Sequence, residues 1–304
     1  MYDIIIVGAG PAGLTSAIYA RRASKKVLVI EAQNYGGQII NTLDIENYPA
    51  EPHISGFDLA TKLYNQAKDL GAEIIFEKVV DIVDNKEEKE VITISNKYSA
   101  KAIILATGSE NRKLGLSNED ELVGKGVSYC ATCDGAFYKN KKVAVVGGGN
   151  TAIEDALYLT DIADKVYLIH RRNSFRAEES TINSLKEKKN IEFIYNSNIT
   201  KLNANEKLES IEVTNINGDV KTIEVDGLFI AVGRIPENQN FAKLINLDKN
   251  GYIIAKEDCK TNIEGIFVAG DNRVKEVRQL VTATSDGAVA ATNAIKYINS
   301  KKVS

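Results

Sequence analysis

The sequence predicts an α/β protein with two Rossmann-like nucleotide-binding domains of the three-layer ββα type, the second inserted into a discontinuous first. Strand-like runs alternate with helical patterns, and a glycine-rich strand–loop–helix unit occurs twice. Near the C-terminus, one strand and one long helix follow without a strand system of their own. The length of 304 residues is also typical of about two domains.

The composition is that of an ordinary globular chain, with 44 % hydrophobic and 26 % charged residues. The net charge of −3 and the absence of a basic tail give no sign of a nucleic-acid partner. Apolar runs are far shorter than the ~20 residues that span a bilayer, so no membrane segment is expected. No secretory signal is expected, and three cysteines do not form an extracellular disulfide framework. We therefore expect a cytoplasmic protein.

The first glycine-rich unit is "YDIIIVGAGPAG" (2–13), followed by a helical segment and a second strand that ends in Glu31. Its nucleotide-binding residues are predicted to be Gly8, Gly10, Pro11, Ala12 and Gly13. The first glycine permits a tight turn, the second lets the backbone approach a pyrophosphate, and the third lets helix and strand pack closely. The helix N-terminus offers its N–H groups to the phosphates.

The second unit is "KKVAVVGGGNTA" (141–152), again followed by a helical pattern and a strand. Its predicted nucleotide-binding residues are Gly147, Gly149, Asn150 and Thr151. Ala152 takes the third glycine position, where a small side chain is sufficient. The strand–helix context on both sides makes two ligand-free glycine turns an unlikely coincidence.

The residues that end the two second strands predict different nucleotides. Glu31 lies 23 residues after Gly8, and a carboxylate there accepts hydrogen bonds from a ribose 2′-OH and repels a 2′-phosphate. His170 lies 23 residues after Gly147, and three arginines follow it: Arg171, Arg172 and Arg176. Guanidinium groups suit a 2′-phosphate. The first loop is therefore predicted to bind FAD or NAD, and the second NADP(H).

The repeat also predicts the domain boundaries. "KAIILATGS" (101–109) and "DGLFIAVGR" (226–234) have the same form and close the two units. "GIFVAGD" (265–271) is a further strand, and residues 280–298 form the long helix. We expect a first domain over 1–114 and 241–304, a second over 115–240, and crossovers near 113–116 and 236–243.

The stretch "SYCATCDGAFY" (128–138) carries Cys130 and Cys133, with Asp134 directly after them. A zinc site needs four ligands, and the chain adds only Cys259, His53 and His170. A permanent crosslink between positions this close would constrain little. A redox pair is favoured over a metal clip or an inert thiol pair. A flavin could relay the electron pair from NADPH to such a disulfide, and Asp134 could give a proton to the leaving sulfur.

The chain resembles the low-molecular-weight thioredoxin reductases over nearly its full length. The matching stretches are "GAGPAG", "GGQ", "IENYP", "ATG", "CATCDG", "GGGNTA", "HRRNSFR", "AVGRIP", "AGD" and "RQLVTATSDG". The most specific is "CATCDG" between two dinucleotide loops. One departure is "DNRVKEVRQ" (271–279) after the AGD motif, which leaves the preferred partner open.

The resemblance implies FAD in the first domain and NADPH in the second. For FAD it adds Gly37, Gln38, Asn47, Ala106, Gly108, Gly270, Asp271, Arg278 and Gln279. For NADPH it adds Gly233 and Arg234. It also implies a homodimer, a domain rotation about the two crossovers, and reduction of thioredoxin or a thioredoxin-like protein. Cys133 is expected to interact with the flavin, and Cys130 to attack the partner.

The predicted function is therefore an NADPH-dependent thioredoxin reductase in which electrons pass through FAD and the Cys130–Cys133 disulfide. Within enzymes, the alternatives are a reductase of a glutaredoxin-like or peroxiredoxin-linked carrier, or an enzyme like ferredoxin–NADP reductase. A redox-sensing nucleotide-binding protein without turnover and a zinc-clipped structural protein are the non-enzyme alternatives. The sequence assigns no role to His53, and it indicates that Cys259 is an incidental thiol.

Overall fold

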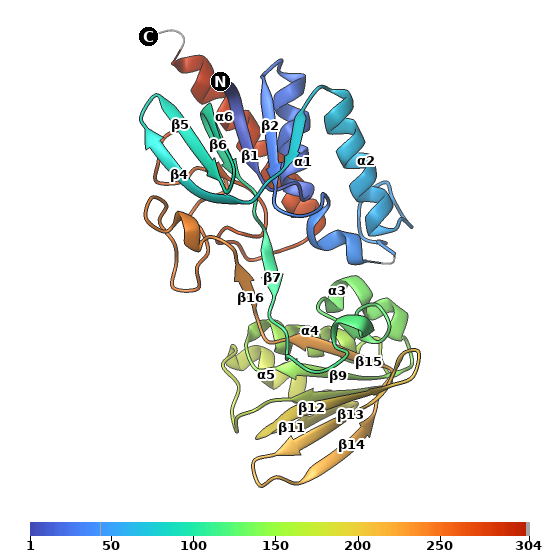
Figure 1. The fold of residues 1–304 in the computed structure, drawn as a ribbon. Coiled ribbons are helices and arrows are strands. Elements are labelled where there is room, and N and C mark those ends of the chain that lie inside the picture. Colours follow the sequence, from blue (N-terminus) through green and yellow to red (C-terminus); the bar gives the residue numbers. More distant parts are fainter. Residues whose placement is uncertain (43, 302–304) are drawn as a thin grey trace. The chain divides into compact units, whose positions relative to one another are not determined.

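The computed structural model describes residues 1–42 and 44–301, which form two compact units (Figure 1). The first unit runs over Met1–Glu110 and continues from Ile235 into the C-terminal part of the chain; the second is Asn111–Arg234. The connecting strands β7 (Ser109–Asn111) and β16 (Arg234–Pro236) pair as a two-stranded sheet. The boundaries therefore lie a few residues before the expected 114/115 and 240/241.

The first unit is built on a mixed sheet. Its strands are β1 (Tyr2–Val7), β2 (Val27–Glu31), β3 (Glu73–Phe76), β4 (Val79–Asn85), β5 (Glu88–Thr93), β6 (Lys97–Leu105) and β17 (Ile266–Val268). The order is β3-β2-β1-β6-β5-β4, and β17 also pairs with β6. β1, β2, β3, β6 and β17 are parallel, whereas β4, β5 and β6 pair antiparallel. The parallel strands place their carboxyl ends, and the loops that follow them, along one edge.

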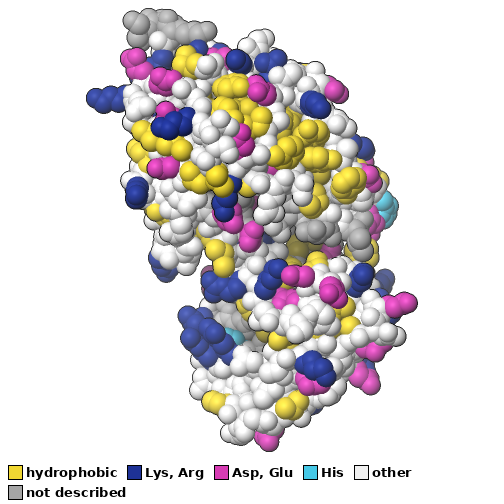
Figure 2. Space-filling model, viewed as in Figure 1, with side chains coloured by type: hydrophobic (Ala, Val, Ile, Leu, Met, Phe, Trp, Pro, Cys, Tyr) yellow, Lys and Arg dark blue, Asp and Glu magenta, His cyan; other side chains and the backbone are white. Residues whose placement is uncertain are grey.

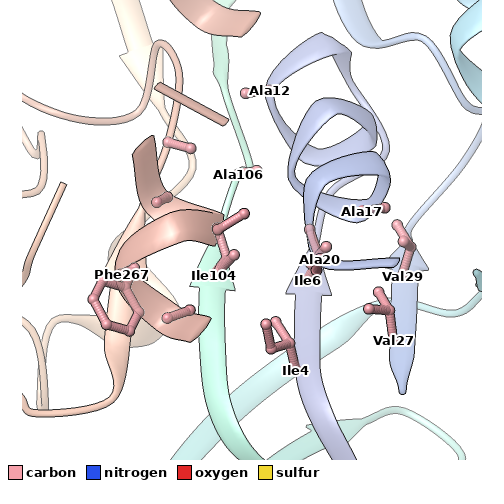
Figure 3. Close-up of a cluster of buried hydrophobic side chains, with 14 of the residues drawn as sticks. Ile4, Ile6, Ala12, Ala17, Ala20, Val27, Val29, Ile104, Ala106 and Phe267 are labelled. Atoms are coloured by element: carbon pink, nitrogen blue, oxygen red, sulfur yellow. The ribbon is translucent and has the colours of Figure 1, made fainter. Parts of the chain in front are cut away.

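Helices cover one face of this sheet. They are α1 (Pro11–Arg22), α2 (Gly56–Asp69) and α6 (Leu280–Ser300). Alternate strand residues such as Ile4 and Ile6 point toward α1, and Figure 3 shows them beside Ala17 and Ala20 of that helix. The helix α6 packs against α1, and Ser16 Oγ donates a hydrogen bond to the Gly287 carbonyl oxygen at 3.0 Å. The C-terminal helix thus completes the first unit, as the sequence predicts.

The intervening strand residues, such as Ile5 and Val7, point to the opposite face of the sheet. There they pack with residues that follow the inserted unit, among them Phe241, Ile245 and Ile253. Two cores on either side of one sheet give the three-layer arrangement.

The second unit repeats this plan with a five-stranded parallel sheet. Its strands are β8 (Val127–Ser128), β9 (Lys142–Gly147), β10 (Lys165–Ile169), β11 (Ile191–Ile194) and β15 (Gly227–Ala231), in the order β11-β10-β9-β15-β8. Helices α4 (Asn150–Thr160) and α5 (Glu179–Lys186) share one core with this sheet. The antiparallel sheet of β12 (Ser197–Ala204), β13 (Leu208–Asn215) and β14 (Val220–Glu224) shares the other.

Short helices complete the two units. They are η1 (Gly37–Asn41), η2 (Asp120–Leu122), α3 (Ala131–Asp134), η3 (Gly135–Tyr138) and η4 (Gln239–Phe241). None of the helices within the described residues combines the length and apolar character needed to cross a membrane.

Candidate active site

The two sequence-predicted cysteines form a disulfide. Cys130 and Cys133 are bonded through their sulfur atoms, with their Cα atoms 5.3 Å apart. Cys130 is the residue before α3, and Cys133 lies within that helix, so one short turn carries both. Both residues are half-buried. A half-buried disulfide in a short surface turn is accessible to a reductant and to a second disulfide.

The Asp134 carboxyl lies beside this turn and accepts a hydrogen bond from Ser128 Oγ, with 2.6 Å between the oxygens. Burial raises the pKa of Asp134, and the hydrogen bond from Ser128 opposes that rise. A carboxyl whose pKa is raised toward neutrality can exchange a proton with a sulfur leaving group.

The first glycine loop has the form of a pyrophosphate cradle. Gly8 adopts φ +106°, and a methyl group on it would overlap the Ala106 carbonyl oxygen at the end of β6. A methyl group on Gly13 would overlap the Gly8 carbonyl oxygen. The helix α1 begins after Gly10 with Pro11 in its first turn, and no side chain caps it. Its first N–H groups therefore remain available to phosphate oxygens, which fits FAD.

Glu31 ends β2 beside this loop. One carboxylate oxygen accepts a hydrogen bond from the Ala9 backbone N–H at 2.7 Å, and the other accepts one from Gln33 N–H at 3.0 Å. Because a carboxylate oxygen has a second lone pair, the side chain can accept hydrogen bonds from a ribose while it is held by the loop.

The other predicted FAD residues lie in five short segments of the same unit. Gly36 N–H donates to the Ala9 carbonyl oxygen at 2.8 Å, which places Gly37 against Gly10 and Gln38 after it. Ala106 and Gly108 follow β6, and Gly270 and Asp271 follow β17. The Asn47 amide donates to the Gln279 side chain at 3.3 Å, and the Arg278 guanidinium lies 4.3 Å from the centre of the Tyr252 ring. All of these segments belong to the first unit.

A buried ionic cluster fixes the segment that carries Asp271 and Arg278. Asp286 on α6 accepts hydrogen bonds from the Gly270 N–H at 3.0 Å, from both the Nε and Nη2 of Arg273 at 2.8 Å, and from Lys275 at 2.9 Å. These bonds keep the pKa of Asp286 below its usual value despite burial. Cys259 is fully buried beside this cluster, and burial raises the pKa of its thiol to about 12, which makes it unreactive.

The second loop repeats the cradle. A methyl group on Gly147 would overlap the Ala231 carbonyl oxygen, just as Gly8 lies against Ala106. The helix α4 begins at Asn150, directly followed by Thr151, and no side chain caps it. Gly149 is exposed, with open space where a side chain would stand. This loop therefore also fits a pyrophosphate.

The arginines that follow β10 are tied to this loop by the backbone. Arg176 N–H donates to the Gly148 carbonyl oxygen at 2.7 Å, and Glu178 N–H donates to the Asn150 side chain at 3.1 Å. Arg171, Arg172 and Arg176 are exposed, and Figure 2 shows Lys and Arg side chains gathered along one edge of this unit. Guanidinium groups beside an uncapped helix N-terminus form a site for a phosphorylated ribose.

His170 follows β10 and packs against the second glycine loop. Its ring is buried against Gly148, where a methyl group would overlap it, and it packs on Phe175 at 5.3 Å between ring centres. Burial lowers the pKa of His170. The neutral ring therefore forms the floor beneath the loop, and the arginines provide the charge. Gly233 and Arg234 follow β15, after the strand that pairs with β9.

Comparisons with known proteins show the family of the chain. The family model for pyridine nucleotide-disulphide oxidoreductases matches residues 2–287. Curated thioredoxin reductases from Listeria monocytogenes and Bacillus subtilis are 46 % and 42 % identical to the chain. The alignments cover 100 % and 98 % of this chain and 96 % and 95 % of those proteins. The chain belongs to the pyridine nucleotide-disulphide oxidoreductase family.

Solved structures agree with the sequence relatives. Thioredoxin reductase from Streptococcus pyogenes is 40 % identical and superposes with a TM-score of 0.94 over 99 % of both chains. The Lactococcus lactis thioredoxin reductase, described as in the FR conformation, is also 40 % identical, with a TM-score of 0.69 over 99 % of this chain and 100 % of that one.

These comparisons confirm several predictions from the sequence. They confirm the resemblance to low-molecular-weight thioredoxin reductases and the two-domain α/β class. They also confirm an NADPH-dependent oxidoreductase with FAD, in which the Cys130–Cys133 disulfide is the redox centre. The individual roles of the cofactor-binding and catalytic residues remain predictions.

Sequence reasoning missed several supporting residues. Ser128 lies two residues before Cys130 in the quoted motif, and only its contact with Asp134 makes it prominent. Arg273 lies in a polar stretch and Asp286 in the long C-terminal helix, and nothing in their spacing indicates that they meet.

Proposed function

We propose that the chain reduces the disulfide of thioredoxin or a thioredoxin-like protein, with Cys130, Cys133 and Asp134 as its catalytic residues. The observation that carries the proposal is the Cys130–Cys133 disulfide beside the half-buried carboxyl of Asp134, in the unit that also holds the basic nucleotide loop. The curated relatives of matching length are thioredoxin reductases.

The cofactor sites follow from the two cradles. We assign FAD to the first loop, with Glu31 on the ribose, and NADPH to the second, with Arg171, Arg172 and Arg176 on the 2′-phosphate. When bound, NADPH and FAD supply the electron pair that reduces the disulfide. The His170 ring supports the loop and makes no contact with phosphate in this assignment.

The cysteines then reduce the partner by thiol–disulfide exchange. Reduction of the Cys130–Cys133 bond by two electrons and two protons gives two thiols. The Cys130 thiolate attacks the partner disulfide, forms a mixed disulfide and releases one partner thiolate. Cys133 then attacks Cys130, which restores the internal disulfide and releases the second partner thiolate. Asp134 exchanges the protons that the sulfur atoms take up and give off.

A coupled assay tests this proposal. Purified protein with NADPH and thioredoxin is expected to reduce a disulfide reporter, whereas Cys133→Ser, which cannot restore the internal disulfide, is expected to lose turnover. Full activity in that variant would contradict the mechanism. Turnover with a glutaredoxin-like or peroxiredoxin-linked carrier, but not with thioredoxin, would assign a different partner.

The two connecting segments are proposed hinges of a domain rotation, because buried side chains anchor the chain on both sides of them. Asn238 is fully buried and donates to the carbonyl oxygens of Gly251 and Asn272 at 2.9 and 2.8 Å. In the second unit, buried Glu119 accepts the backbone N–H groups of residues 114–116 at 2.9 to 3.2 Å. These anchors limit the hinges to residues 108–113 and 233–237.

Hydrogen exchange tests the hinge assignment. Amides of 114–116 are expected to exchange slowly, and Glu119→Gln is expected to weaken their protection without changing that of Arg112, whose amide donates to the Gly233 carbonyl oxygen beside the β7–β16 pair. Unchanged protection of 114–116 in Glu119→Gln would contradict the assignment of the anchor.

We also propose a homodimer formed by the first unit and a cytoplasmic location. Exposed aromatic side chains occur on α1, α2 and β3 of that unit: Tyr19, Phe57 and Phe76. Figure 2 shows apolar side chains gathered on one face of the same unit. A surface of this kind favours association with a second copy. Sedimentation equilibrium is expected to give twice the 33.2 kDa chain mass, and a monomer at micromolar concentration would contradict the dimer.

A further inference from the structure

Ser128 lies at the end of β8, directly before the redox turn. The residue is 3 % exposed, and its backbone is fixed by pairing of β8 with β15, opposite Phe229. Because the backbone of Ser128 is held in a sheet, its hydroxyl has a defined position. Cys130 is only two residues further along the chain, so its position is defined by the same strand.

The hydroxyl group contacts both ends of the turn. Ser128 Oγ lies 2.6 Å from Asp134 Oδ2, a distance typical of a charge-assisted O–H···O⁻ bond. The same oxygen accepts the Cys130 backbone N–H at 3.1 Å. A hydroxyl has one hydrogen to donate and two lone pairs. The short bond to Asp134 uses the hydrogen, which leaves a lone pair for Cys130 N–H.

Tyr138 is a further titratable group near Asp134. Tyr138 on η3 is near enough for the Asp134 charge to contribute to its raised pKa, which burial brings to about 12, and Asp226 acts on the same phenol. Neither tyrosine nor aspartate at neutral pH brings positive charge toward Asp134. Burial and Ser128 are the two influences that set the pKa of this carboxyl.

We propose that Ser128 is a positioning residue for disulfide exchange, because its hydroxyl orients the Asp134 carboxyl and ties it to the backbone of Cys130. The inference rests on the proposed function, in which Asp134 exchanges protons with the sulfur atoms. Ser128 itself contacts no reacting atom. It sets the direction of the carboxyl and stabilises its ionised form, so that Asp134 can regain its proton as well as give it.

The direction of the expected effect follows from the hydrogen bond. Loss of a donor to the ionised carboxylate favours the protonated form and raises the pKa of Asp134. We expect Ser128→Ala to move the Asp134 limb of the pH–kcat profile upward by about 1 pH unit. Ser128→Thr keeps a hydroxyl at the same position and is expected to keep the limb close to that of the unmodified protein.

The matched control is Ser197→Ala. Ser197 lies in the same unit, is 4 % exposed and donates its hydroxyl hydrogen to the Tyr195 backbone carbonyl, but it contacts no carboxyl. If buried hydroxyls mattered only for folding, Ser197→Ala and Ser128→Ala would behave alike. Melting temperatures of all variants measure that structural contribution separately.

The experiment is a set of pH–kcat profiles from about pH 5 to 9, with thioredoxin and NADPH, for the FAD-loaded protein and its variants. Asp134→Asn identifies the limb that belongs to Asp134. Turnover by the unmodified protein tests the proposed function, and the comparison of Ser128→Ala with Ser197→Ala tests this inference. An upward shift confined to Ser128→Ala and reversed in Ser128→Thr supports it. An unmoved limb in Ser128→Ala, or a limb that persists in Asp134→Asn, overturns it.

Discussion

The two nucleotide loops have the same backbone geometry and differ in the side chains that lie beside them. Gly8 and Gly147 lie against the carbonyl oxygens of Ala106 and Ala231, and both following helices begin without a side-chain cap. In the first loop, Glu31 is hydrogen-bonded to the loop backbone. In the second, His170 is buried beneath the loop and the arginines are exposed beside it. The glycine cradle is therefore common to the two loops, and we expect the residues after the second strand to select the nucleotide.

The largest effect is expected from a substitution that disrupts the glycine turn of the first loop only. Gly13→Ala places a methyl group on the Gly8 carbonyl oxygen, so we expect loss of FAD from the purified protein and about 1–3 kcal/mol of destabilisation. The second loop already has Ala152 in this position, and Ala152→Gly is expected to cost only about 1 kcal/mol.

Flavin absorbance and melting temperature measure both variants. Retention of FAD by Gly13→Ala at the level of the unmodified protein would show that close helix–strand contact is not what the first loop requires.

The next largest effect is expected from the arginines beside the second loop. Replacing Arg171, Arg172 and Arg176 together with glutamine is expected to raise the KM for NADPH by about 100-fold, because charge-assisted bonds to the 2′-phosphate are lost. The KM for NADH should change little.

A matched control replaces three exposed lysines of the same unit, Lys186, Lys201 and Lys221, with glutamine. Steady-state kinetics with both nucleotides make the comparison. Equal increases in KM for NADPH and NADH would show that the arginines do not bind the 2′-phosphate.

The smallest effect compares equivalent positions on the two helices. Eight residues after the first glycine, α1 has buried Ser16 and α4 has Asp155. Burial raises the pKa of Asp155 to about 7, with a further contribution from Glu154, and Arg234 opposes it. Because this is above the ordinary value of about 4, the folded protein binds the proton more tightly, and the associated stability is lost as pH rises from about 4 to 7.

Asp155→Asn should remove this pH dependence and stabilise the protein above pH 7 by about 1–3 kcal/mol. Chemical denaturation of the cofactor-free protein at pH 5 and pH 8 measures the difference. The same pH dependence in the variant as in the unmodified chain would assign it to another group.

The sequence was sufficient for the repeated part of the molecule. The glycine spacing and the flanking strands predict both loops, and the contrast between Glu31 and the arginines predicts their different nucleotides. These predictions succeed from sequence because each feature depends on residues that are close in the chain. His170 shows the limit of this reasoning. Its place after the strand predicts a ligand contact, which stays a prediction, whereas the burial of its ring against Gly148 is a packing outcome that spacing does not encode. The same holds for the Asp286–Arg273 pair and for Glu119, whose partners are set by tertiary contacts and turns.

The central claim is that electron pairs reach Cys130–Cys133 through a bound flavin, and an anaerobic titration of flavin absorbance with NADPH tests it most directly. A protein with both a flavin and a redox disulfide should need about two equivalents of NADPH for full reduction, and Cys133→Ser about one. One equivalent for both proteins, or no flavin absorbance in the purified chain, would contradict the claim.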